Sequence, residues 1–107
     1  MTFAPGQVVT VFRSRLRPDA GHGYADTSAE MVRLATAMPG FVEVKSFVAD
    51  DGERVTIATF ADDAAEQAWR DHPDHRLAQR AGRDRFYGEY SIQVCTTVRT
   101  SRFPTPG

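Results

Sequence analysis

The turn Asp50-Asp51-Gly52 predicts a β-hairpin and is the strongest local structural signal in this chain. It separates two apolar segments, 41–49 and 53–60, in which valine, isoleucine and phenylalanine recur. β-Branched and aromatic residues favour strands, and an Asp-Gly pair between two such segments favours a tight connection. The two segments are therefore expected to be antiparallel neighbours in one sheet.

A strand and a helix are predicted on the N-terminal side of the hairpin. Residues 7–16 contain the run from Val8 to Phe12, which is apolar on both faces and favours a strand. Residues 24–38 repeat apolar side chains with the period of an amphipathic helix, and Pro39-Gly40 ends that helix.

Helical segments and a last strand are predicted on the C-terminal side. Asp62 or Asp63 is suited to cap a helix that runs through Trp69. Pro73 suits the first turn of a second helical segment that runs to about residue 84. Residues 86–98 then read as a long strand.

The order strand–helix–strand–strand–helix–strand is typical of the α+β ferredoxin-like fold. In this fold the helices cover one face of a four-stranded antiparallel sheet. Residues 1–107 are interpreted as a single domain with its core at about 7–98. Residues 1–6 are expected to form a loose arm and residues 99–107 a flexible tail.

The apolar composition points to a shared core. Only three leucines and two isoleucines occur among the 107 residues. The strands nevertheless carry apolar residues on both faces: Val42, Val44 and Val48 are expected opposite Phe41 and Phe47. A sheet that is apolar on both faces but covered on one favours a partner. We therefore expect a homodimer formed through the sheet faces.

Charge and hydropathy exclude several classes of protein. The net charge of −1 comes from 13 basic and 14 acidic side chains, which indicates no nucleic-acid-binding surface. No apolar stretch approaches the roughly 18 residues of a membrane span, and the N-terminus lacks the pattern of a secretory signal. The single cysteine, Cys95, allows no disulfide framework and is expected to pack at an interface. The expected location is the cytoplasm.

Two segments resemble a known family. Between Phe60 and Tyr90, Trp69 is followed by the motif His72-Pro73-x-His75 and then by Gln79. The turns Met38-Pro39-Gly40-Phe41 and Asp51-Gly52-Glu53 fit the same pattern. In these features, residues 7–98 resemble the antibiotic biosynthesis monooxygenase domain proteins of the dimeric α+β barrel superfamily.

The resemblance implies a fold and a range of activities. Two ferredoxin-like subunits would pack their sheets together, with a pocket between each sheet and its helices. Relatives include cofactor-independent monooxygenases of anthrone-type aromatics, quinol monooxygenases and haem-degrading monooxygenases. The expected function is therefore the oxidation of a small planar phenolic, quinol or anthrone-type compound by O₂, with no cofactor. A superfamily of this kind hosts unrelated chemistries, so the fold alone does not establish the reaction.

Candidate site residues follow from this chemistry. The resemblance implies that Trp69 lines the substrate pocket, although a tryptophan here also suits a plain helix–sheet core. A histidine near neutrality can accept a phenolic proton, so His75 and, with less preference, His72 are the candidate catalytic bases. Their spacing across Pro73 differs from that of zinc-binding helical pairs, and no metal site is expected.

Four further side chains are candidates for substrate binding. A developing oxyanion needs hydrogen-bond donors, and the sequence offers Arg13, Arg83, Tyr87 and Tyr90 for this role. Each has an ordinary alternative as a surface, core or interface residue. Arg13 in particular lies on a strand face whose arginines would equally suit the carboxylates of a partner subunit.

Two other readings of the sequence stay open. The haem-degrading branch uses an asparagine on the first strand, a tryptophan on the second helix and an axial histidine about ten residues after that tryptophan. Here Gln79 stands at the position of the histidine, and the chain has no asparagine. Haem binding through His75 or His72 is therefore the third reading. The oxygenase branch also uses an asparagine, so the second reading is a non-catalytic dimer that binds a small molecule or serves as an interaction module.

Overall fold

The computed structural model describes residues 3–21 and 23–104. Its strands are β1 (Val8–Leu16), β2 (Phe41–Val48), β3 (Arg54–Phe60) and β4 (Tyr87–Thr96). Its helices are α1 (Tyr24–Thr36), α2 (Asp63–Arg70) and α3 (Pro73–Ala81), and a π-helical turn, η1 (Gly82–Phe86), joins α3 to β4. Within these residues no helix is long and apolar enough to cross a membrane.

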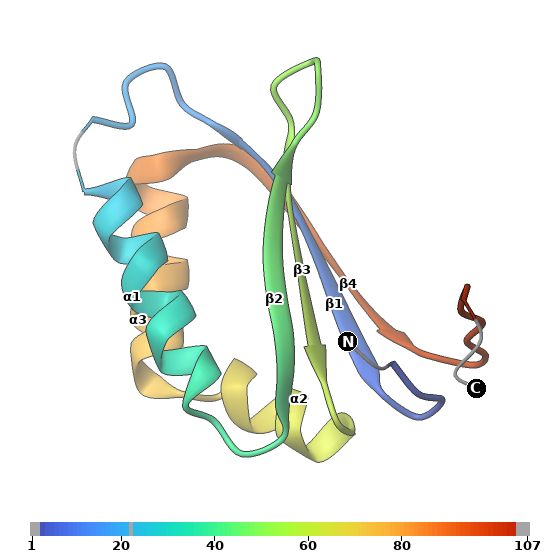
Figure 1. Ribbon diagram of the computed structural model, residues 1–107. Coiled ribbons are helices and arrows are strands. Elements are labelled where there is room, and N and C mark those ends of the chain that lie inside the picture. The colour runs from blue at the N-terminus through green and yellow to red at the C-terminus, as the bar shows by residue number, and fades with distance from the viewer. Residues whose placement is uncertain (1–2, 22, 105–107) are drawn as a thin grey trace.

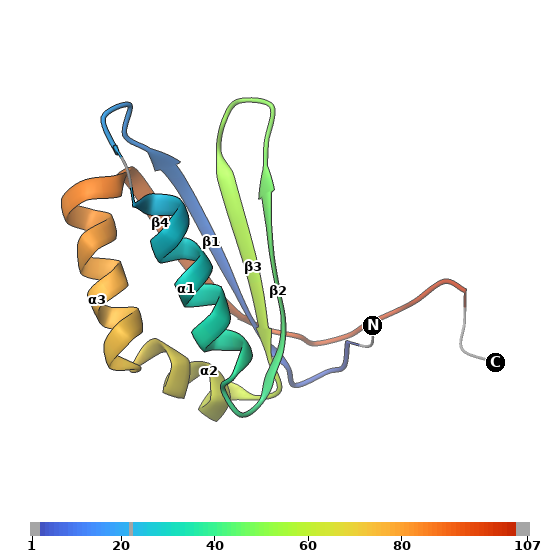
Figure 2. The same ribbon diagram turned by 60° about the vertical axis from the view of Figure 1, so that its left-hand side comes forward.

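The strands form one antiparallel sheet in the order β2-β3-β1-β4. The helices lie on one face of this sheet, and the other face is left without a helix (Figures 1 and 2). The α+β ferredoxin-like fold predicted from the order of elements is therefore confirmed. Residues 99–104, the described part of the predicted tail, form neither helix nor strand, and residues 1–2 and 105–107 lie outside the described chain.

The core lies where α1 and α2 pack against the end of the sheet at which β3 finishes, at the bottom of Figure 1. Phe60, which is 0% exposed, packs there with Ala35, Ala58 and Trp69. Gly40 makes this close packing possible, because a Cβ at its position would lie 2.6 Å from the Cβ of Ala65. The φ of Gly40 is also +81°, a left-handed conformation that favours glycine.

Side-chain caps fix the corner between α2 and α3. Asp62, one of the two predicted caps, accepts the backbone N–H of Ala65 at 2.8 Å. His72 caps α3, since its Nδ1 accepts the backbone N–H of Asp74 at 3.1 Å, and Pro73 occupies the first turn as predicted. This corner sets the position of Trp69, at the end of α2, relative to the residues of α3.

One expected side-chain face is wrong. Phe41 was expected opposite Val44, but the register shifts between Phe41 and Glu43, so Phe41 pairs with Phe60. The rings of Phe41 and Phe60 lie 6.3 Å apart in an edge-to-face arrangement inside the core. An irregularity of this kind inserts one residue and reverses the alternation of side chains beyond it.

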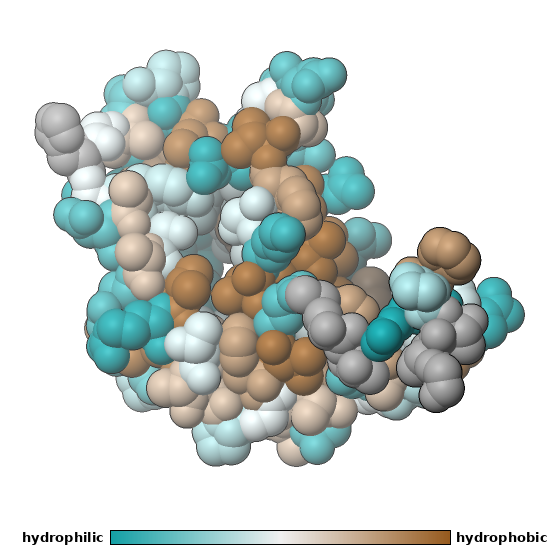
Figure 3. Space-filling view, viewed as in Figure 1, coloured by the Kyte–Doolittle hydropathy of each residue, from teal (hydrophilic) through white to brown (hydrophobic). Residues whose placement is uncertain are grey.

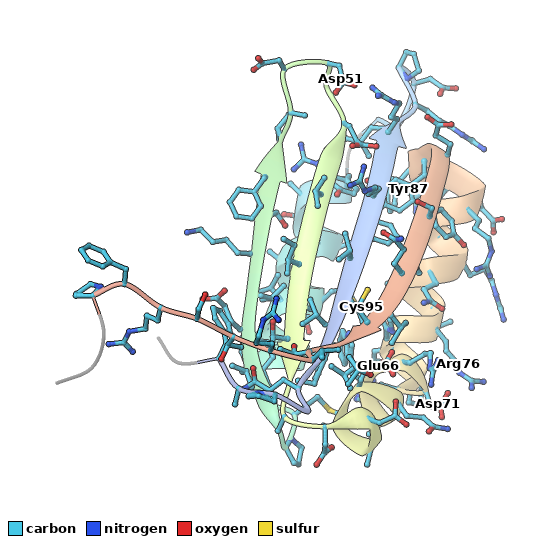
Figure 4. All side chains as sticks on the ribbon, turned by 90° about the vertical axis from the view of Figure 1, so that its right-hand side faces the viewer. Asp51, Glu66, Asp71, Arg76, Tyr87 and Cys95 are labelled. Carbon is cyan, nitrogen blue, oxygen red and sulfur yellow. The ribbon has the colours of Figure 1, made fainter. Side chains whose placement is uncertain are left out.

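The face of the sheet that points away from the helices carries an apolar centre. We call this the outer face. The cross-strand pairs Val11–Ile57 and Phe47–Val55 lie on it, and so does Val9, which pairs with Cys95. Figure 4 views this face directly and shows Cys95 on it. The expectation that apolar residues occupy both faces of the sheet therefore holds.

Charged residues at one end of the outer face pair within the chain. Arg15 contacts Asp51 at 2.8 Å and Glu89 at 3.2 Å, and Arg13 contacts Glu53 at 3.4 Å. The sequence also allowed these arginines to pair with carboxylates of a partner subunit. Because they pair within the chain, no such partner is needed to balance their charge. The pairs are exposed, so each contributes little to stability.

Candidate functional site

A cavity of about 220 Å³ lies between the sheet and the helices. Its aromatic lining consists of Phe12, Tyr24, Trp69, Phe86, Tyr87 and Tyr90. The remaining wall combines aliphatic side chains with hydroxyl-bearing serine and threonine residues and a few larger polar residues. The cavity is open on the side of β4, where Ile92 and Val94 line it and are nearly half exposed. Figure 3 shows hydrophobic side chains gathered across the middle of the molecule, with a hollow between the helices and the β2–β3 hairpin.

His75 forms part of the cavity wall, as its candidate role requires. Its ring stacks on that of Trp69, with the ring centres 4.5 Å apart and the planes 21° from parallel. The buried Nδ1 atom has no hydrogen-bond partner among the described residues. Burial lowers the pKa of His75 from 6.5, while the carbonyls of Arg70 and Trp69 act in the opposite sense. His75 is therefore neutral at pH 7 and can accept a proton.

Tyrosine hydroxyls gather at the other end of the cavity. Tyr24, Tyr87 and Tyr90 all line it, and the ring of Tyr87 lies 5.8 Å from Tyr24 and 5.9 Å from Tyr90. Burial raises the pKa of the Tyr87 hydroxyl, and the neighbouring Tyr24 hydroxyl raises it further. Tyr87 therefore stays protonated at neutral pH and remains a hydrogen-bond donor.

The other candidate residues lie outside the cavity wall. His72 is used as the cap of α3, although its ring lies 5.8 Å from that of Trp69. Arg13 points to the outer face of the sheet and pairs with Glu53. Arg83 is exposed, but its Nη1 donates a hydrogen bond of 3.3 Å to the hydroxyl of Tyr90, so it contacts the site through that tyrosine.

Sequence reasoning missed Glu66, a buried acid in the cavity wall. The side chain of Glu66 is 3% exposed, and its Oε2 lies 3.5 Å from Nη2 of Arg70. Burial raises the pKa of Glu66, and the charge of Arg70 partly offsets this. The available signal was its position three residues before Trp69, which places both side chains on one face of α2.

Two observations bear on metal and haem. Within the residues that the structure describes, no three His, Cys, Asp or Glu side chains gather to hold a metal ion. Gln79, which stands where the haem-degrading relatives have their axial histidine, lines the cavity together with His75. The position is thus part of the site, but it carries an amide.

Comparison with known sequences establishes the family. Residues 7–81 match the family described as antibiotic biosynthesis monooxygenase. The uncharacterized protein YqjZ of Bacillus subtilis strain 168 is 32% identical over 93 residues, which cover 87% of this chain and 82% of that protein. The chain therefore belongs to the antibiotic biosynthesis monooxygenase family, and the resemblance seen in the sequence is confirmed.

Solved structures agree on the fold. SnoaB, a cofactor-independent oxygenase from Streptomyces nogalater, superimposes with a TM-score of 0.75 at 20% identity, covering 95% of this chain and all (100%) of that one. Rv0793 from Mycobacterium tuberculosis gives a TM-score of 0.78 at 18% identity, covering 90% of this chain and 99% of that one. At these identities the likeness shows a shared architecture.

Proposed function

We propose that this protein is a monooxygenase that oxidises a compact planar aromatic compound with O₂ and without a cofactor. The substrate is a phenol, a quinol or an anthrone-type compound of about two or three fused rings, which suits an apolar cavity of about 220 Å³. The observation that carries the proposal is the neutral imidazole of His75, stacked on Trp69 in the wall of an aromatic cavity. The likeness to SnoaB supports it.

The proposed reaction of an anthrone-type substrate is balanced in atoms and electrons. His75 accepts the proton of the substrate's phenolic or enolic hydroxyl, and the resulting anion passes one electron to O₂. The substrate radical and superoxide then combine through a new carbon–oxygen bond. The peroxide takes back the proton from His75 and loses water, which leaves a carbonyl. One O₂ is consumed, one oxygen atom enters the product and the other leaves as water.

Protein groups at both ends of the cavity support this sequence of steps. The aromatic walls hold a planar ring system and exclude water, which strengthens electrostatic interactions at the reacting atoms. The hydroxyls of Tyr87 and Tyr90 can donate to an oxyanion at the end away from α2. Arg83, bonded to Tyr90, places a positive charge behind that donor.

Oxygen uptake tests the proposal directly. Protein freed of metal by a chelator is mixed with 1,8-dihydroxyanthrone or with 1,4-dihydroxynaphthalene, first without O₂ and then in air. We expect no turnover without O₂ and, in air, uptake well above the rate without protein. With ¹⁸O₂ and the anthrone, one labelled atom should appear in the new carbonyl. Uptake at the protein-free rate with both substrates, or a new carbonyl without ¹⁸O, would contradict the proposal and favour a binding protein.

We also propose that two copies of this chain associate through their outer faces. No helix covers the apolar centre formed by Val9, Val11, Val55 and Ile57, and the segment that follows β4 crosses only one end of this face (Figure 4). These four side chains are half-buried, and Phe47 beside them is 48% exposed. Exposed apolar patches on a sheet favour burial against another sheet, and a second copy supplies a matching surface.

The variant Ile57→Arg tests the dimer. Its guanidinium would remain in water in a monomer but would be buried unpaired in the centre of a sheet-to-sheet interface. We expect sedimentation velocity to show a dimer for the parent protein and a monomer for Ile57→Arg, with the dissociation constant raised more than about 100-fold. Gln67→Arg, which adds the same charge at an exposed position of α2 on the helix side of the sheet, should stay dimeric. A parent protein that is monomeric at micromolar concentration would show that the outer face is not an interface.

A further inference from the structure

Glu66 lines the cavity, and its carboxyl group is not fully satisfied by the described residues around it. Its side chain is 3% exposed, and Oε2 is buried without a hydrogen-bond partner among the described residues. Nη2 of Arg70 lies 3.5 Å away, which is longer than a well-formed charge-assisted hydrogen bond. Leaving a buried carboxyl group unpaired is costly, so a carboxyl group of this kind in a cavity wall points to a donor that binds there.

We propose that the carboxyl group of Glu66 determines specificity by accepting a hydrogen bond from a hydroxyl group of the aromatic ligand. The ligand is the compound named under the proposed function, so the inference deepens that function and rests on its choice of site. A hydroxyl donor satisfies the carboxyl group, whereas an ether or a bare ring edge leaves it unpaired in the cavity. The site therefore selects hydroxylated rings over their alkylated counterparts.

Arg70 favours a neutral donor over a cation. Its guanidinium lies beside the carboxyl group and already balances its charge, so an ammonium group in the cavity would face a positive neighbour. The side chain of Arg70 is 49% exposed, so its charge is partly solvated and the carboxyl group keeps its capacity to accept. An alcohol or phenol brings a donor without a charge and fits this arrangement.

The two ends of the cavity give the bound ligand a direction. Figure 4 places Glu66 near α2 and Tyr87 at the far end, where β4 begins, and both residues line the same cavity. The Glu66 end offers an acceptor and the Tyr87 end offers a donor. A ligand with a hydroxyl at one end and a carbonyl or oxyanion at the other would satisfy both, with its rings held between the aromatic walls.

Equilibrium dialysis with a matched pair of probes tests this role without any turnover. 2-Naphthol and 2-methoxynaphthalene share a ring system and differ in the hydroxyl donor, and anaerobic buffer prevents oxidation. We expect the parent protein to bind 2-naphthol about tenfold or more tightly than its methyl ether. Glu66→Leu should bind the two probes within about twofold of each other, because the gain from the hydroxyl is lost.

Control variants separate the role of Glu66 from general effects. Asp63→Asn removes a charge from an exposed position on the same helix, outside the cavity, and should keep the tenfold preference. If Glu66→Leu does not fold, Glu66→Gln keeps an acceptor oxygen and should reduce the preference to a few-fold, since a neutral acceptor forms a weaker bond.

Four outcomes would overturn the proposal. The first is equal binding of 2-naphthol and its methyl ether by the parent protein, and the second is a preference that survives Glu66→Leu or is undiminished in Glu66→Gln. The third is that a cationic probe, 2-(aminomethyl)naphthalene, binds most tightly, and the fourth is that no probe binds up to millimolar concentration. The first three would leave oxygenation through His75 intact. Conversely, a protein that consumes no O₂ can still show the expected preference, so the two proposals fail separately.

Discussion

His75→Phe is expected to lower kcat/KM for the proposed oxygenation by about 10²- to 10⁴-fold, the usual contribution of a general base. Phenylalanine keeps an aromatic ring that can stack on Trp69, where the two rings now lie 4.5 Å apart, so the cavity wall should keep its shape. Only the proton acceptor is removed. The measurement is the initial rate of oxygen uptake with 1,8-dihydroxyanthrone, corrected for the rate without protein.

The pH profile provides a second readout of the same residue. Because burial lowers the pKa of His75 below 6.5, the imidazole stays neutral as the pH falls from 8 to 7 and becomes protonated only below 6.5. The parent kcat/KM should therefore be level near neutrality and decline with an acid limb below pH 6.5. His75→Phe should lack this limb.

His72 supplies a matched control for His75. His72→Asn keeps a side-chain acceptor at the N-cap of α3, where Nδ1 now binds the N–H of Asp74, and asparagine is a favoured cap. We expect activity within about threefold of the parent, since N-cap replacements act mainly on stability. If activity falls with His72→Asn and persists with His75→Phe, the general base is His72 and the assignment to His75 is wrong.

Phe60→Ala is expected to reduce the free energy of unfolding by about 3–5 kcal/mol. Phe60 is 0% exposed, and it packs against the edge of Phe41 and beside Trp69, so its loss leaves a void that rigid neighbours cannot fill. Domains of this size are stable by only about 5–15 kcal/mol, so a large fraction of the total is at stake. Urea unfolding followed by circular dichroism measures the change.

Phe103→Ala is the matched control for this stability prediction. It removes the same number of atoms from a side chain that is 96% exposed, and it should change the free energy of unfolding by less than about 0.5 kcal/mol. If Phe60→Ala lowers the free energy of unfolding no more than Phe103→Ala does, the cluster of Phe60, Ala35, Ala58 and Trp69 is not the core of this protein.

The elements were predictable because their signals are local. The Asp50-Asp51-Gly52 turn, the cap at Asp62 and Pro73 at the start of α3 act within a few residues, and the structure has each where the sequence places it. The register shift at Phe41 was not predictable, because alternation along a strand assumes an unbroken pairing that only the neighbouring strand decides.

The candidate site was predictable in part. Trp69 and His75 stand in a motif that resembles the family, and both line the cavity. Tyr87 and Tyr90 line it as well, but the π-helical turn that precedes them, and so their direction, has no clear sequence signature. Glu66 reads as one more solvated acid on a polar helix, and only its packing shows that it is buried.

The sequence by itself determined the order of elements, the fold class and the family, because periodicity, turns and short motifs depend on residues close in the chain. The tertiary structure decided which charged and polar groups meet. It paired Arg13 and Arg15 with carboxylates of their own chain, used His72 as a cap, and brought Glu66 and His75 into one apolar wall. Burial and the pKa shifts that follow from it depend on contacts across the whole fold. These contacts give the two histidines of one short motif different roles, with His72 as a helix cap and His75 in the cavity wall.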